Sequence, residues 1–342
     1  MRRLLLIACT LVLLVADVAG NAGAQPSVAA PSWATPQIKT VVAAGLMAPS
    51  VATFRPDDPL LFGELADAIV ALGAPVPATY DPDRVVTMRE LDSRLVAAEG
   101  LQPEARHIRL EAADAGVTPT SWLGTETVAR LLGLRINHPL DQEQLELELS
   151  QPATRAEAAY SIAQLLTMPT SELESVRAEA DAFSLPALTP WQQTILRRAL
   201  HFVGSPYVWA GTSEKPQEVD GQTVPGGFDC SGFVWRVYNL QPFAAAPSLS
   251  GVLKGRTTYA MSGEVAKSAR IPRSKLQPAD LVFFGPHGPQ SKPAEIGHVG
   301  IYLGNGWIVH AYRRGVAMEP MAGWLNTTFA WGRSPLTEAG LS

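Results

Sequence analysis

The strongest constraint on the fold is a pair of alternating apolar runs separated by Gly304-Asn305-Gly306, which predicts a β-hairpin. A two-residue Asn-Gly turn would pair Gly304 with Trp307, whereas a three-residue loop with Gly306 left-handed would pair Leu303 with Trp307. We expect the three-residue loop, because its register makes one face of the hairpin wholly apolar. The apolar face then consists of Val299, Ile301, Leu303, Trp307, Val309 and Ala311.

The opposite face of this predicted hairpin carries two histidines, His298 and His310. In the expected register Gly300 lies opposite His310 and leaves room for its ring, and His298 is a diagonal neighbour within side-chain reach. In the alternative register the two rings lie on opposite faces. The histidines can therefore act together only if the register is the expected one.

The chain has two cysteines, and only Cys230 lies outside the amino-terminal segment. Asp229 is placed to cap a helix whose inward face is Phe233, Val234, Val237 and Tyr238. Cys230 would then stand in the first helical turn, where the helix dipole and free amides favour the thiolate. We expect a catalytic thiol, with His298 as its base and His310 orienting that base.

Two other interpretations compete with this assignment. A buried, inert cysteine is the commoner role for such a residue. Cys230, His298 and His310 could also ligate zinc, although no close Cys or His pair with structural-site spacing is present. The paired histidines favour the nucleophile, so we expect no metal and no cofactor.

The amino terminus has the pattern of an export signal. Arg2 and Arg3 precede an apolar run from residue 4 to 18, and Ala22-Gly23-Ala24 offers a cleavage site. We expect a signal peptide over 1–24, a secreted protein, and no stable membrane span after cleavage. A lipoprotein box at Cys9 is a minor alternative. The net charge of −5 is mild and indicates no nucleic-acid partner.

The rest of the chain divides into a helical part and a mixed part. We expect a linker over 25–48, a helical domain over 49–168, a second linker over 169–189, a catalytic domain over 190–335 and a tail over 336–342. The helical part contains three similar segments, in which a helix follows a turn and carries Glu in its first turn. These segments resemble S-layer homology repeats, which implies attachment to a cell-wall polymer.

Four motifs, in order, resemble the NlpC-type papain-like cysteine peptidases of bacterial cell walls, over residues 191–335. They are Gly204-Ser205-Pro206-Tyr207-Val208-Trp209, Phe228-Asp229-Cys230-Ser231-Gly232, Leu276-Gln277-Pro278-Ala279-Asp280-Leu281 and Gly297-His298-Val299-Gly300-Ile301-Tyr302 with His310. The resemblance implies an α+β fold with the cysteine helix packed on an antiparallel sheet. It also implies that Cys230, His298 and His310 are catalytic and that Tyr207, Asp229 and Ser231 hold the substrate.

The expected function is that of a secreted peptidoglycan hydrolase. In the resembled family the cut falls in the stem peptide, after γ-D-glutamate, and proceeds through a thioester on the cysteine. Two alternatives stay open from the sequence. One is a non-catalytic wall-binding or surface protein, and the other is an amidase or acyltransferase built on the same fold.

Overall fold

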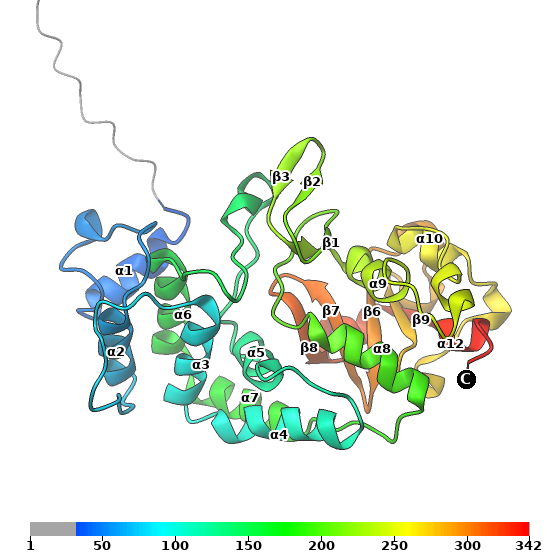
Figure 1. Ribbon diagram of the computed structural model, residues 1–342, viewed down its shortest axis with the longest axis horizontal. Coiled ribbons are helices and arrows are strands. Elements are labelled where there is room, and N and C mark those ends of the chain that lie inside the picture. The colour runs from blue at the N-terminus through cyan, green and yellow to red at the C-terminus, as the bar shows by residue number, and fades with distance from the viewer. Residues whose placement is uncertain (1–31, 342) are drawn as a thin grey trace, which may run out of the picture. The chain divides into compact units, whose positions relative to one another are not determined.

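A computed structural model describes residues 32–341, and the chain from Trp33 onward forms one compact unit (Figure 1). The expected signal peptide over 1–24 lies outside the described residues. The helices are α1 (Thr35–Ala43), α2 (Phe62–Ala71), α3 (Met88–Ala98), α4 (Gln102–Asp114), α5 (Leu123–Leu131), α6 (Arg155–Thr167), α7 (Thr170–Asp181), α8 (Pro190–His201), α9 (Cys230–Tyr238), α10 (Thr258–Gly263), α11 (Gly323–Thr328) and α12 (Pro335–Glu338). Within the described part of the chain, no helix is both long and apolar enough to cross a membrane.

The strands follow α8 and form one large sheet and two small ones. They are β1 (Thr212–Ser213), β2 (Gln217–Val219), β3 (Gln222–Val224), β4 (Gly227–Phe228), β5 (Leu281–Phe284), β6 (His298–Gly304), β7 (Trp307–Tyr312), β8 (Gly315–Pro320) and β9 (Phe329–Arg333). The large sheet is antiparallel with the order β8-β7-β6-β5-β9. An α+β domain preceded by a helical region, as the sequence predicts, is confirmed.

The helical region is built around a closed ring of three backbone hydrogen bonds. Leu60 N donates to Ala153 O (2.8 Å), Ala153 N donates to Val86 O (2.9 Å), and Val86 N donates to Leu60 O (3.0 Å). Each of these residues stands two positions before a helix, α2, α3 or α6. The three similar sequence segments therefore occupy equivalent positions around one ring. The second and third helices, α3 and α6, are capped by Thr87 and Thr154, whose side chains accept from Glu90 N and Glu157 N.

Parts of the expected linkers and tail are packed structure. Helix α1 lies inside the expected linker 25–48, buries Ile38 and Val41 and packs against α6, so this stretch belongs to the core. A linker is what the composition of this stretch predicts, since it is rich in Ala, Pro, Ser and Thr. Helix α7 occupies most of the expected linker 169–189. The expected tail 336–342 begins inside α12 with a buried Leu336.

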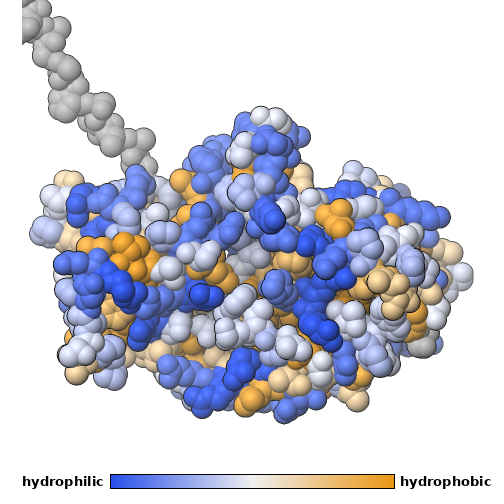
Figure 2. Space-filling view, viewed as in Figure 1, coloured by the Kyte–Doolittle hydropathy of each residue, from blue (hydrophilic) through white to orange (hydrophobic). Residues whose placement is uncertain are grey.

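The cysteine helix and the large sheet enclose the apolar core of the second region. The expected inward residues of α9, Phe233, Val234, Val237 and Tyr238, are all fully buried. Helix α9 packs on β6 and β7, and α8 packs on α9 (Figure 1). A smaller apolar cluster that includes Phe284, Ile308 and Leu325 covers the opposite face. The surface in the same view is mainly hydrophilic, with scattered apolar patches (Figure 2).

The β6–β7 hairpin has a different turn from the one predicted. Gly304 pairs with Trp307, so the turn consists of Asn305 and Gly306, both with positive φ (48° and 83°), and the predicted pairing of Leu303 with Trp307 is wrong. A register shift between Tyr302 and Gly304 then restores the predicted pairing of Ile301 with Val309. The apolar and histidine faces are therefore those expected, although the turn is not.

The helical region holds the backbone that follows α8. The buried Arg130 side chain donates to Gly204 O (2.9 Å) and to Glu126 Oε2 (2.6 Å). Glu143, from a short 3₁₀ helix before α6, accepts from Trp209 N (2.5 Å). The segment from Gly204 to Trp209 is thus fixed by side chains that the sequence places in another predicted domain.

We predict that Glu146 makes stability depend on pH. Burial raises the pKa of Glu146 to about 8, from an ordinary 4.5. Because the folded-state pKa lies above the unfolded one, the stabilisation is complete below about pH 4.5 and is lost as the pH rises through about 8. In Glu146→Gln the amide oxygen can still accept from His138 N, as the carboxylate does at 2.6 Å. The denaturation midpoint should therefore fall less between about pH 5 and about pH 9 in Glu146→Gln than in the wild type.

The matched control is Glu148→Gln, a half-buried carboxylate two positions further along. In Glu148→Gln, the denaturation midpoints at about pH 5 and about pH 9 should differ by as much as they do in the wild type. An undiminished difference in Glu146→Gln would show that burial of this carboxyl does not set the pH dependence.

Candidate active site

Cys230 is the first residue of α9, as predicted. Asp229 caps the helix, since its Oδ1 accepts from Gly232 N (2.5 Å) and from Ser231 Oγ (3.0 Å). Among the described residues, Cys230 is the free cysteine, and 9% of this residue is exposed to solvent. Hydrogen bonds from the backbone amides of Val299 and Ser231 favour the thiolate form of Cys230. Val299 directly follows His298 in β6.

The two predicted histidines meet on one face of the β6–β7 hairpin. His298 Nε2 lies 2.7 Å from His310 Nδ1 in a buried hydrogen bond. Gly300 provides the space, because a Cβ atom there would lie 3.1 Å from His310 Cβ and 3.2 Å from Val309 O. The diagonal arrangement expected from the sequence is therefore present.

A third group, Glu319, continues this chain of hydrogen bonds and was not identified from the sequence. Its Oε1 lies 2.5 Å from His310 Nε2. Glu319 belongs to β8, where it pairs with Ile308 and lies diagonally from His310. The apolar run Val316-Ala317-Met318 before Glu319 was the available signal, since it allows a third strand after the hairpin.

Burial favours the neutral forms of Cys230 and His298. Burial, followed by the negative charge of Asp229, raises the pKa of Cys230 to about 12, against the amides of Val299 and Ser231 and the charge of Arg256. Burial and then His310 lower the pKa of His298 well below its ordinary range. The thiolate bias expected from the helix start is therefore outweighed, because the thiol is almost completely removed from water.

The thiol opens into a cavity of about 470 Å³ that also contains His298. The three predicted substrate-holding residues, Tyr207, Asp229 and Ser231, line it as well. Burial, and then the neighbouring Cys230, raise the pKa of the Tyr207 hydroxyl, so this group remains a hydrogen-bond donor. All six residues singled out in the sequence are thus at or directly behind one cavity.

Arg256 also lines this cavity and was not identified from the sequence. Its guanidinium donates to Ser231 Oγ (2.6 Å), Asp229 Oδ2 (3.2 Å) and Ala210 O (3.1 Å). It comes from the loop before α10, where no periodic pattern marks the residue. The cavity wall therefore contains an ion pair between Arg256 and Asp229.

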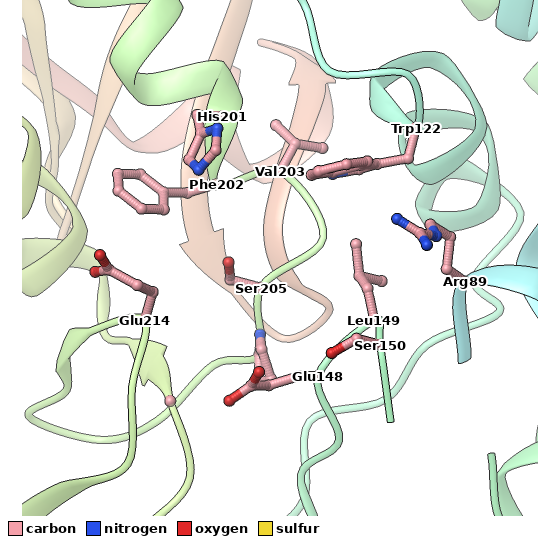
Figure 3. Close-up of a pocket in the computed structure, with 12 residues that line it drawn as sticks. Arg89, Trp122, Glu148, Leu149, Ser150, His201, Phe202, Val203, Ser205 and Glu214 are labelled. Carbon is pink, nitrogen blue, oxygen red and sulfur yellow. The ribbon is translucent and has the colours of Figure 1, made fainter. Parts of the chain in front are cut away.

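A separate cavity of about 210 Å³ is lined by neither Cys230 nor His298. Figure 3 shows it between Trp122 and Arg89 on one side and Glu214 on the other, with His201 at the end of α8. No cysteine is among its lining residues. In the part of the chain that the structure describes, no group of three or more His, Cys, Asp or Glu side chains is arranged to hold a metal.

Comparison with known proteins identifies the domain that holds the thiol. Residues 204–333 match the NlpC/P60 family. The chain is 32% identical over 167 residues to the probable endopeptidase p60 of Listeria grayi, covering 48% of this chain and 26% of the relative. It is 31% identical over 119 residues to the peptidoglycan endopeptidase RipA of Mycobacterium tuberculosis, covering 34% and 21%. The chain thus spans about a quarter of the length of these relatives, and its NlpC/P60 domain is homologous to theirs.

Solved structures resemble the same part of the chain. An NlpC/P60 family protein from Bacillus cereus is 26% identical, with a TM-score of 0.32, and the match covers 45% of this chain and 43% of that one. The peptidoglycan hydrolase RipB of Mycobacterium tuberculosis is 25% identical, with a TM-score of 0.32, covering 42% and 64%.

We predict that Gly300→Val separates the two imidazoles. The added side chain meets His310 and the Val309 carbonyl, so the His298–His310 hydrogen bond should be lost and stability should fall by about 1–3 kcal/mol. A crystal structure and chemical denaturation measure the two effects.

The control is Gly251→Val, at an exposed glycine with no atom within 4 Å of an added Cβ. Both the imidazole pair and the stability should be preserved in this variant. Retention of the 2.7 Å contact in Gly300→Val would contradict the role of this glycine.

Proposed function

We propose that this protein is a secreted peptidoglycan hydrolase that cleaves stem peptides at the γ-D-glutamyl-diamino acid bond. The observation that carries the proposal is the thiol of Cys230, which opens with His298 into one cavity, with His310 bonded behind the imidazole. The family match and the names of the relatives, which include a peptidoglycan endopeptidase, support the substrate class.

The chemistry begins from a neutral thiol and a neutral imidazole. His298 Nε2 is occupied by His310, so Nδ1 is the nitrogen that can accept the proton of Cys230. As this proton moves, the sulfur attacks the peptide carbonyl, and the imidazolium then protonates the leaving amine. Water, deprotonated by His298, hydrolyses the resulting thioester and releases the acid.

The charged groups at the cavity fit a short peptide with unlike charges close together. Arg256 can pair with the free carboxylate of the glutamyl residue, and Asp229 with an amino group. Tyr207 supplies a neutral hydroxyl to the same cavity. These contacts would fix the carbonyl of the scissile bond near Cys230, which converts binding into a rate advantage.

The helical region supports a second, compatible role. Its three equivalent segments surround one hydrogen-bonded ring, and they resemble repeats that attach proteins to cell-wall polymers. Attachment through this region would keep the enzyme at its substrate. In the non-catalytic alternative, the whole protein would bind the wall and release nothing.

We predict that Cys230→Ala abolishes release of peptide fragments from purified peptidoglycan while binding to it persists. Removing the sulfur eliminates the nucleophile and leaves Asp229 and Arg256 in place. Mass spectrometry of the products from defined muropeptides measures both the loss and the bond that the wild type cuts.

Glu179→Gln, a substitution on α7, is the control and should release fragments at the wild-type rate. Equal release by Cys230→Ala would contradict the thioester mechanism. Binding without release by the wild type would instead support the non-catalytic alternative.

A further inference from the structure

Glu319 forms a hydrogen bond with His310, behind the proposed base His298. Its Oε1 lies 2.5 Å from His310 Nε2, on the side of the ring away from His298. Burial alone would raise the pKa of Glu319, but the hydrogen bond from His310 and the positive charge of Arg314 lower it below its ordinary value. The carboxylate is therefore ionised, and an ionised carboxylate can only accept hydrogen bonds.

Because Glu319 can only accept, it determines which nitrogen of His310 and of His298 carries the proton. His310 must donate from Nε2 to Glu319, so a neutral His310 accepts at Nδ1. His298 Nε2 lies 2.7 Å from that Nδ1 and must be the donor there. A neutral His298 that carries its proton on Nε2 has an unprotonated Nδ1. Only this tautomer can take the proton of the Cys230 thiol.

We propose that Glu319 is a positioning residue that fixes the tautomer of His298 through His310. This inference rests on the proposed function, since it names the group that prepares its base. Without Glu319, the His298–His310 hydrogen bond can form with either ring as the donor. In the reversed arrangement His298 carries its proton on Nδ1 and cannot act as the base.

The same carboxylate stabilises the charge that develops during the reaction. The thiol proton moves to His298 Nδ1, the sulfur forms its bond to the carbonyl carbon, and His298 becomes positively charged. The proton later leaves with the amine. While the imidazolium exists, Glu319 lies two hydrogen bonds away and lowers its energy.

A cavity beside Glu319 gives access for a direct test. It has a volume of about 260 Å³ and is lined by His310, Glu319, Arg313 and Arg314, among others. The Glu319 side chain is 32% exposed. If Glu319 is shortened, a small carboxylate from solution can enter beside the two arginines and accept from His310 Nε2.

The test compares Glu319→Ala with and without formate, using chloride at equal ionic strength as the reference. Glu319→Ala should lower kcat by about 100-fold and change KM by less than about 3-fold, and formate should restore kcat by about 10-fold. A residue that only supports the fold would not respond to formate. Unchanged kcat, or a loss that formate does not relieve, would overturn the proposal.

A second readout needs no substrate. Selective ¹⁵N labelling of the six histidines allows the protonated nitrogen of each ring to be identified by NMR. Wild-type His298 should be protonated on Nε2, and Glu319→Ala should show a mixture of both tautomers. An unchanged single tautomer would overturn the proposal. If the wild type releases no fragments, the proposed function fails, but the NMR result still tests Glu319.

Two further variants complete the comparison. Glu319→Gln keeps the size of the side chain and removes its charge, so it should lose less of kcat than Glu319→Ala and should not respond to formate. It also replaces Glu319→Ala if that variant does not fold. Glu179→Ala removes a carboxylate on α7 whose charge acts on Glu319. It should keep the wild-type tautomer and kcat, and a loss equal to that of Glu319→Ala would contradict a specific contact.

Discussion

The hydrogen bond between His298 and His310 depends on one irregularity in the β6–β7 hairpin. The two-residue turn at Asn305 and Gly306 would, in a regular ladder, put the rings on opposite faces. The register shift between Tyr302 and Gly304 reverses that outcome and returns both rings to one face. Gly304 permits it, because its φ is 109° and a Cβ there would lie 2.4 Å from Pro186. The proposed base therefore depends on a backbone feature outside the cavity.

Sequence patterns predicted the parts of the fold that follow from local chemistry. The α9 cap, its inward face and the alternation of the hairpin all come from short-range preferences and were confirmed. The turn was predicted wrongly, since hydrophobic alternation fixes which face a side chain occupies and does not count the residues of a bulge. Arg256 was missed because it contacts Asp229 from a loop 27 residues further along the chain, and Glu319 was missed because strand β8, which directly follows β7, was not predicted. The buried thiol was misjudged for a similar reason, since burial is a property of the packed molecule.

The helical region and the NlpC/P60 domain are joined by specific polar contacts rather than by a bare linker. Arg130 binds Gly204 O, and Glu143 accepts from Trp209 N, on either side of Tyr207. Arg314, in the turn before β8, donates to Arg130 O (2.6 Å). Side chains and backbone of the helical region therefore hold the chain on both sides of Tyr207 and the turn before β8, the strand that carries Glu319. The helical region thereby supports the site whether or not it also binds a wall polymer.

In the proposed mechanism, Cys230 forms a covalent bond to the stem peptide during turnover. This bond can be detected in rapidly quenched reactions with a defined muropeptide, followed by mass spectrometry of the digested enzyme. We expect a thioester adduct on the Cys230 peptide, with the mass of the fragment that ends in γ-D-glutamate. Turnover of the muropeptide without any adduct, together with turnover by Cys230→Ala, would contradict this mechanism.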